Sequence, residues 1–225
     1  MQPTFKNISG IVLLTLLASF SWLMLKIIVL YIPLNPDTGF LQLKQAYLHI
    51  DAWRIAFYIH VFSSLLALLA GFTQFSKQLL KVKPTLHRKL GYVYVINILF
   101  ITGPAGLVMS LYANGGSSSR IAFTFLDILW IFFTAMALHK AVKKDFISHR
   151  AFMIRSYSLT LSALSLRAWK VVFEEFTPMA PVDRYRIIAW LGWGLNLVIA
   201  EIIITRLLKR KKKNFPRVFP LIDAK

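Results

Sequence analysis

Three ionisable side chains fall inside apolar segments of the sequence, where a charge is costly. His60, Asp127 and Arg167 lie on three different segments. Each is about six to eight residues from the end of its segment that is predicted to reach the outer membrane surface. At about 1.5 Å per residue, this places all three about 9–12 Å below that surface. An ion pair between Asp127 and Arg167, with His60 beside it, would offset most of the burial cost. Such a trio is typical of a proton relay or a solute site.

A second group of ionisable side chains lies at the opposite ends of the segments. His87 and His149 each stand directly before an arginine at the start of an apolar segment. Neutral imidazoles bind haem iron axially, and guanidinium groups suit the haem propionates. His87 and His149 would then share one haem b, and the propionates would meet nearby arginines: Arg88, Arg150 and Arg155. Contact with lipid headgroups is the simpler alternative for each pair.

One more pair of opposite charges is predicted near the same membrane face. Arg155 lies early in its segment, and Glu201 lies about two turns from the end of the last segment. Their depths are comparable, so we expect an ion pair between these two side chains.

Small and polar residues form periodic faces on two segments. On the first, the face consists of His60, Ser64, Ala67 and Gly71. On the second, it consists of His149, Ser156, Thr160, Ala163 and Arg167. Such faces allow close helix packing. They also leave room for a flat cofactor or a substrate, so both interpretations stay open.

Six apolar segments must position all of these groups. They cover residues 9–32, 52–73, 89–113, 121–142, 151–173 and 185–208. Each is long enough to cross a hydrocarbon core of about 30 Å as a helix. Gly103 and Pro104 predict a kink within the third segment. We predict an all-α, polytopic membrane helix bundle with six transmembrane helices. It forms a single domain over residues 1–225, with a motif-bearing core over about residues 52–174.

The positive charges predict the orientation of this bundle. The chain has 27 Lys and Arg against 9 Asp and Glu. Most of the basic residues lie before the first segment, between the second and third, between the fourth and fifth, and after the sixth. The positive-inside rule therefore places both termini in the cytoplasm. The basic tail at residues 209–225 is expected to anchor this topology and to attract anionic lipids.

Composition excludes several other classes of protein. Of the 225 residues, 57% are hydrophobic and 16% are charged, which is typical of a bilayer protein and not of a soluble domain. The absence of cysteine excludes disulfides, zinc–thiolate sites and thiol nucleophiles. No hydrolase or nucleotide-binding motif occurs. Nucleic-acid binding is disfavoured because no folded, aromatic-rich basic domain accompanies the basic run.

Several strings of residues resemble one known family. They are HRAFMIRSY from His149 to Tyr157 with Leu159-Thr160 and Leu166-Arg167 after it, HRKLGY from His87 to Tyr92, and His60 with Gly71. They resemble a bacterial membrane family known as domain of unknown function 2306, over about residues 58–167. The resemblance implies a polytopic protein of the bacterial inner membrane and supplies no activity.

A more distant likeness connects the histidines to four-helix membrane cytochromes b. It implies one haem b near the cytoplasmic side, and a quinone or a small electron donor as partner. Two other hypotheses stay open. One is a small-solute or proton-coupled transporter that uses His60, Asp127 and Arg167. The other is a non-catalytic membrane protein whose polar residues only fix helix packing.

Overall fold

The structure is a computed structural model that describes residues 5–214, and within that range it is built of helices with no β-strand. In chain order the elements are α1 (Phe5–Val29), the 3-10 helix η1 (Gly39–Tyr47), α2 (Asp51–Thr73), α3 (Lys77–Val82), α4 (Pro84–Ile96), the π-helix η2 (Asn97–Thr102), α5 (Gly103–Ser110), α6 (Ser117–Val142), α7 (Phe146–Thr160), α8 (Ser162–Phe176) and α9 (Pro181–Asn214). The all-α prediction is therefore confirmed.

Four stretches of helix are long and apolar enough to cross a membrane. They are Asp51–Thr73, Pro84–Ser110, Ser117–Val142 and Pro181–Lys209, and they contain most of the second, third, fourth and sixth predicted segments. At the first predicted segment, the residues whose side chains are described contribute a shorter apolar helix, Ala18–Val29. The structure thus supports a polytopic membrane protein with four candidate spanning helices among the described residues, and the six passages stay a prediction.

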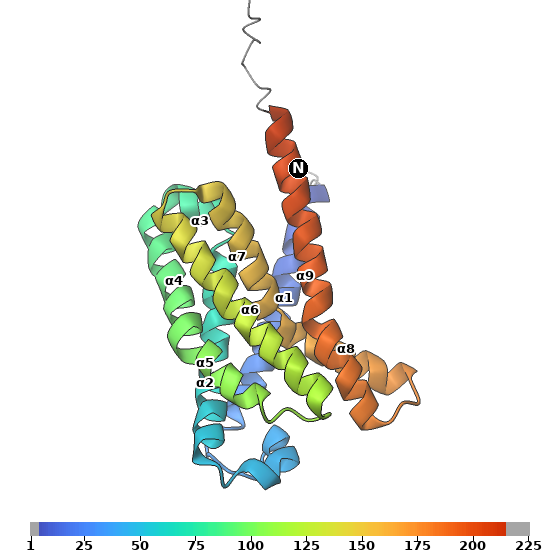
Figure 1. Ribbon diagram of the computed structural model, residues 1–225. Coiled ribbons are helices and arrows are strands. Elements are labelled where there is room, and N and C mark those ends of the chain that lie inside the picture. The colour runs from blue at the N-terminus through green and yellow to red at the C-terminus, as the bar shows by residue number, and fades with distance from the viewer. Residues whose placement is uncertain (1–4, 215–225) are drawn as a thin grey trace, which may run out of the picture.

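The fifth predicted segment is not one continuous helix. α7 ends at Thr160, and α8 begins at Ser162 and diverges from the bundle (Figure 1). Hydroxyl groups around the break bond to carbonyls of the preceding turn, as Thr160 does to Ser156 and Ser162 to Leu159. Such back-bonding competes with the regular helix pattern and bends helices. The helix predicted over residues 151–173 is therefore interrupted at Leu161, between α7 and α8.

The kink predicted in the third segment is present. Pro104 has no N–H to donate to the preceding turn, and the residues before it form the π-helix η2. The helix resumes as α5 at Gly103. The widened turn faces α2, which positions the carbonyl of Thr102 for the site described below.

The connections between the helices lie at two ends of the molecule (Figure 1). η1, the α5–α6 connection and the α8–α9 connection lie at one end, here called the η1 end. α3 and the α6–α7 turn lie at the other, here called the α3 end, together with the start of α1 and the end of α9. Of the predicted basic tail, residues 215–225 lie outside the described residues.

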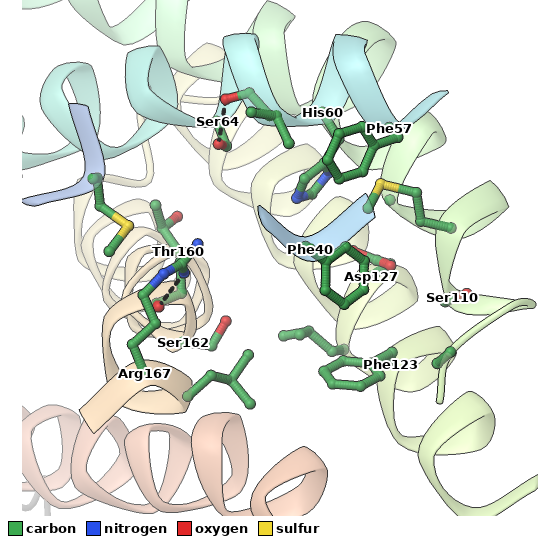
Figure 2. A pocket seen from close by; sticks show the side chains of 18 of the residues that line it. Phe40, Phe57, His60, Ser64, Ser110, Phe123, Asp127, Thr160, Ser162 and Arg167 are labelled. Carbon is green, nitrogen blue, oxygen red and sulfur yellow. Dashed lines mark hydrogen bonds between the residues drawn. The ribbon is translucent and has the colours of Figure 1, made fainter. Parts of the chain in front are cut away.

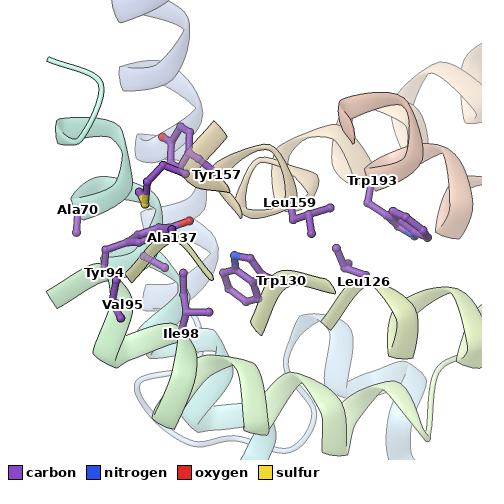
Figure 3. Packing of buried hydrophobic residues seen from close by; sticks show 12 residues of the cluster. Ala70, Tyr94, Val95, Ile98, Leu126, Trp130, Ala137, Tyr157, Leu159 and Trp193 are labelled. Carbon is purple, nitrogen blue, oxygen red and sulfur yellow. The ribbon is translucent and has the colours of Figure 1, made fainter. Parts of the chain in front are cut away.

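A large buried cluster extends from the cavity toward the α3 end. Tyr94, Trp130 and Tyr157 form the centre of a buried cluster with Ile98 (Figure 3). Gly71 permits this approach, because a Cβ atom there would lie 2.6 Å from the rings of both Tyr94 and Tyr157. At the η1 end a separate aromatic cluster surrounds Tyr31, Trp53 and Phe57 and closes that end of the bundle.

Candidate functional site

A cavity of about 330 Å³ lies in the half of the bundle toward the η1 end. Residues from α1, η1, α2, α5, α6, α7, α8 and α9 line it. His60, Asp127 and Arg167 are all among its lining residues (Figure 2). Its size falls within the range of small-molecule sites. The three side chains that matched in depth therefore share one cavity, although they come from α2, α6 and α8.

Asp127 is a buried carboxyl group on the α6 wall of the cavity. Its side chain and backbone together are 6% exposed. Gly106 of α5 makes room for it, because a Cβ atom at Gly106 would lie 2.6 Å from Oδ1 of Asp127. Within residues 5–214 no hydrogen bond or ion pair involves this carboxyl. A buried polar group without a partner is costly, and such groups concentrate at functional sites.

His60 lies on α2, and one of its ring nitrogens is already bonded. Nδ1 lies 3.1 Å from the carbonyl oxygen of Thr102 in η2. Because a carbonyl only accepts, Nδ1 carries a proton and donates it, which leaves Nε2 for another partner. A hydrogen bond between Ser63 and the Thr102 hydroxyl, 2.7 Å long, fixes the same contact between α2 and η2. In Figure 2 the imidazole ring points into the cavity.

Arg167 lies across the cavity from Asp127 (Figure 2). Its Nη1 donates to the carbonyl of Ala163, four residues earlier, at 2.7 Å. Among the ion pairs of the described residues none joins Arg167 to Asp127, so the predicted pairing is not formed in this structure. The physical reason is the break at Leu161, because α8 leaves the axis of α7 and carries Arg167 to the opposite wall.

Lys44 of η1 is a lining residue that the sequence analysis did not single out. It is 2% exposed, and its ammonium group donates to the carbonyl of Tyr112 and, at 2.6 Å, to Oδ1 of Asn114. Burial, and secondarily the charge of Arg120, lower the pKa of Lys44 from 10.5 to about 8. The one available sequence signal is a lone lysine set among the aromatic residues of the first connection.

The ammonium group of Lys44 also lies over two aromatic rings. It is 5.5 Å from the centre of the Phe40 ring and 5.1 Å from that of Tyr47. Both rings belong to η1 itself. The hydrogen bonds of the ammonium group to Tyr112 and Asn114 hold this short helix against the α5–α6 connection. The η1 end of the cavity is thus covered by a polar contact as well as by the aromatic cluster.

The two periodic faces each divide into a packed part and a cavity-lining part. Toward the α3 end, the hydroxyl of Tyr94 bonds to Ser156 at 2.7 Å and to Thr160 at 2.9 Å, and Ser156 also bonds to Thr134. Ser156 is fully buried, and this part of the face is helix packing. Toward the η1 end, the same two faces contribute residues to the cavity lining: His60, Ser64, Thr160, Ala163 and Arg167.

His87 and His149, both toward the α3 end, are partly buried. Nδ1 of His149 lies 2.8 Å from the carbonyl of Ala137, which leaves its Nε2 available. Nδ1 of His87 is buried and has no hydrogen-bond partner among the described residues. Arg88 and Arg150 are exposed. Within the described chain no three metal-binding side chains of the His, Cys, Asp and Glu types cluster together.

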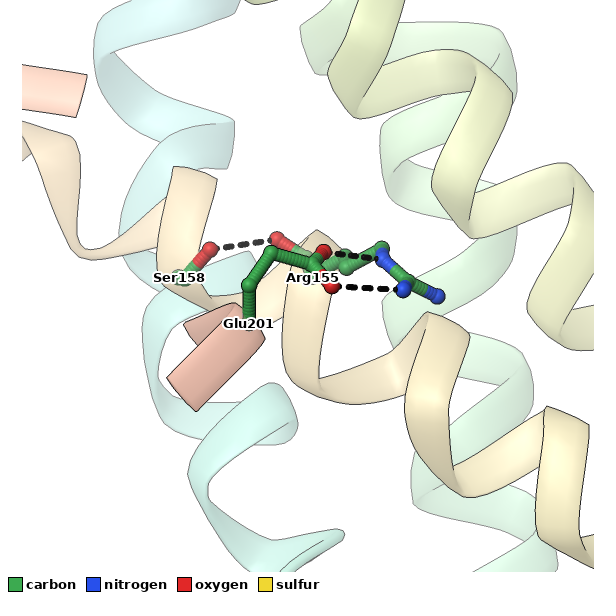
Figure 4. A network of polar contacts seen from close by, with 3 residues as sticks. All are labelled: Arg155, Ser158 and Glu201. Atoms are coloured by element: carbon green, nitrogen blue, oxygen red, sulfur yellow. Dashed lines mark hydrogen bonds and ion pairs between the residues drawn. The ribbon is translucent and has the colours of Figure 1, made fainter. Parts of the chain in front are cut away.

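Arg155 and Glu201 are joined by the structure. Two parallel hydrogen bonds connect them, from Nε to Oε1 at 2.5 Å and from Nη2 to Oε2 at 2.8 Å (Figure 4). The guanidinium group also lies over the rings of Phe133 and Phe152. The two hydrogen bonds connect α7 to α9.

Comparison with known proteins gives one match. A family model described as a predicted membrane protein (DUF2306) matches residues 57–204. The match extends beyond the segment that carries the recognisable strings and includes most of α9. Neither a curated protein nor a solved structure matches the chain. Because the family model covers more than half of its length, the chain belongs to this DUF2306 family of predicted membrane proteins.

Proposed function

We propose that this membrane protein is a small-solute carrier that binds its solute in the cavity near the η1 end and moves a proton with it. The observation that carries the proposal is Asp127, a carboxyl that is 6% exposed, lines the cavity and has no partner in the described residues. His60 faces the same space with one ring nitrogen left over. Carboxyl and imidazole groups are the side-chain types that form proton relays in membrane carriers.

Two irregular points in the helices support movement around this cavity. The π-helix η2 adjoins α5, which lines the cavity, and the break at Leu161 separates α7 from α8. Interrupted helices are a recurrent feature of transporter binding sites, and π-helices often mark functional positions. A protein with a purely structural role needs neither a cavity nor interrupted helices beside it.

The basic residues of the connections support an orientation. At the α3 end they include Lys77, Lys81, Lys83, Arg88, Lys89, Lys140, Lys143, Lys144 and Arg150. By the positive-inside rule this end faces the cytoplasm of a bacterial inner membrane, with both termini on that side, and contacts anionic lipids. In this arrangement α1 and the α7–α8 pair complete the six passages, and the cavity lies toward the outer surface.

The second candidate is a redox protein that binds one haem b between His87 and His149. The observation in its favour is Nδ1 of His87, which is buried without a partner among the described residues. His149 would offer Nε2, and Arg88, Arg150 or Arg155 would meet the propionates. The haem would supply one-electron transfer with a quinone or a small donor. An absorption spectrum with a Soret band that disappears in His87→Ala would support this candidate, and a colourless preparation from haem-replete cells would exclude it.

The carrier proposal is tested with four solutes that share a benzene ring and differ in charge: benzoate, benzylamine, phenylalanine and benzyl alcohol. Binding to the folded state raises the temperature at which the detergent-purified protein unfolds. We expect at least one of the four to do so in the unsubstituted protein. Ser64→Trp fills the cavity and should abolish the rise, whereas Leu66→Trp, on the exposed face of the same helix, should preserve it.

Transport itself is measured in proteoliposomes that contain a pH-sensitive dye. The stabilising solute, added outside, should acidify the lumen faster than it does in protein-free liposomes. Asp127→Asn keeps the shape of the side chain but cannot exchange a proton, so it should return acidification to the rate in protein-free liposomes. Unfolding temperatures that respond to none of the four solutes, or that respond equally in Ser64→Trp, would overturn the proposal.

A further inference from the structure

The charges on the cavity wall do not balance. Among the described lining residues, Lys44 and Arg167 are basic and Asp127 is the single acid. Lys44 already donates to two oxygens at the η1 end. The charge that faces the open space of the cavity therefore belongs to Arg167 on one wall and to Asp127 on the other (Figure 2).

Arg167 has most of its hydrogen-bonding capacity unused. A guanidinium group has five N–H donors, and the one hydrogen bond that the described residues provide is to the carbonyl of Ala163. A long basic side chain can extend toward a membrane surface. Here the hydrogen bond to Ala163 turns the side chain back toward the break at Leu161. Arg167 is exposed and is among the residues that line the cavity, so a ligand in the cavity can reach it.

The two opposite charges differ in how they can be neutralised. In a site with little water, a carboxyl group loses its charge by taking up a proton, whereas a guanidinium group keeps its charge at every physiological pH. Asp127 can thus become neutral without a ligand, and Arg167 cannot. The lasting charge of the cavity is positive, and an anion is the ligand that completes it.

The remaining lining describes the rest of the ligand. It is largely apolar and aromatic, with Leu68, Phe57, Phe123, Trp130 and Leu166 among its members. A hydrophilic anion such as inorganic phosphate would leave this surface unused. A carboxylate on an apolar body matches both parts, because a planar guanidinium group binds a carboxylate through two parallel hydrogen bonds.

We infer that the cavity binds a small organic carboxylate with an apolar body, which Arg167 holds by its carboxylate group and which travels with a proton on Asp127. This inference rests on the carrier proposed above and adds the chemical class of its solute. With Asp127 protonated and therefore neutral, the negative charge of the solute offsets the positive charge of Arg167, so the loaded cavity has no net charge. The carboxylate and its proton together move no net charge across the membrane.

The test compares benzoate with benzylamine and benzyl alcohol, which have the same ring. Benzoate should raise the unfolding temperature, and the other two should have little effect. Arg167→Gln should weaken benzoate binding about tenfold or more, because it removes a charge-assisted pair of hydrogen bonds. Arg167→Lys should retain part of the affinity. The matched control is Arg155→Gln, which removes an arginine that Glu201 already satisfies and should leave benzoate binding unchanged.

Each other outcome has a distinct meaning. Stabilisation by benzylamine or benzyl alcohol and not by benzoate would overturn the carboxylate inference and leave the cavity as a solute site. No stabilisation by any of the solutes would overturn the proposed function itself. Should Arg167→Gln fail to fold, the charge series on the unsubstituted protein still decides the class of ligand.

Discussion

The two ends of this helix bundle contain similar polar side chains in opposite states. Toward the α3 end, Ser156 bonds to both Tyr94 and Thr134, and Arg155 is bonded twice to Glu201. Toward the η1 end, Asp127 and Arg167 face a cavity of about 330 Å³ with no bond between them. Polar groups at membrane depth therefore fall into two kinds in this protein. Those with a partner within the protein hold helices together, and those without one face the cavity.

The difference shows which buried groups await a ligand. A satisfied network stabilises the packing of one region and leaves nothing for a solute to bind. Unpaired groups around a cavity cost stability, and proteins retain such groups where they bind or react. We therefore expect substitutions toward the α3 end to lower stability and substitutions around the cavity to lower binding. The four predictions below test this contrast.

The largest effect is expected at Gly71. A methyl group there would lie 2.6 Å from the rings of Tyr94 and Tyr157, which are both held in the packed cluster. Gly71→Ala should therefore lower the free energy of unfolding by about 3 kcal/mol, as overpacking does. The matched control is Gly194→Ala, because a Cβ atom at Gly194 has no neighbour within 4 Å. Equal thermal stability of the two variants would show that this region is loosely packed.

A smaller loss is expected from Tyr94→Phe. The hydroxyl group bonds to Ser156 and Thr160, so its removal leaves buried groups short of a partner and should cost about 1–2 kcal/mol. Tyr92→Phe, on the exposed face of the same helix, should cost almost nothing. Benzoate should stabilise Tyr94→Phe as much as it stabilises the unsubstituted protein. A loss of benzoate binding in Tyr94→Phe would contradict the separation of the two regions.

Lys44 makes stability depend on pH. Its pKa is about 8 in the folded chain and 10.5 when unperturbed, so between these values the unfolded chain binds more protons. Stability should therefore rise with pH across this window, by about 1 kcal/mol between about pH 7.5 and pH 9. Lys44→Met should lack this rise. Parallel pH profiles for the two proteins in denaturant unfolding would show that the buried amine does not titrate there.

The smallest effects are expected for the coupling energies measured by double-mutant cycles, which compare the pair Arg155–Glu201 directly with the pair Arg167–Asp127. Arg155→Met and Glu201→Gln should show a coupling of about 0.5–1 kcal/mol, because their pair is bidentate but partly exposed. The losses of unfolding free energy caused by Arg167→Gln and by Asp127→Asn should be additive to within about 0.5 kcal/mol, because no ion pair joins the two side chains. A larger coupling in the second cycle than in the first would indicate that Asp127 and Arg167 do pair in the membrane.

Much of this architecture could be predicted from the sequence because membrane depth follows from position along an apolar segment. The four spanning helices follow from segment length, and the kink follows from Pro104. Equal depth also grouped His60, Asp127 and Arg167, which line one cavity. Hydropathy is a property of the local chain, so these features need no tertiary information.

The features that were missed depend on direction around a helix or on distant contacts. Equal depth does not fix which way Arg167 points, and the break at Leu161 carries it across the cavity. The break itself depends on which backbone carbonyls accept hydrogen bonds from the hydroxyls of Thr160 and Ser162. Lys44 is buried because Asn114, distant in the sequence, accepts its hydrogen bond. No local pattern encodes these choices.

The central claim is that a solute can reach the side chains around Asp127. The chain contains no cysteine, so a single introduced thiol is unambiguous. Ser64 lines the cavity, whereas its neighbour Ser63 is 9% exposed and bonds to Thr102. The measurement is the rate at which sulfonatoethyl methanethiosulfonate, which does not cross membranes, modifies Ser64→Cys and Ser63→Cys in detergent-purified protein. We predict about tenfold or more faster modification of Ser64→Cys, as the greater accessibility of its thiol dictates. Equal rates at the two positions would contradict the claim.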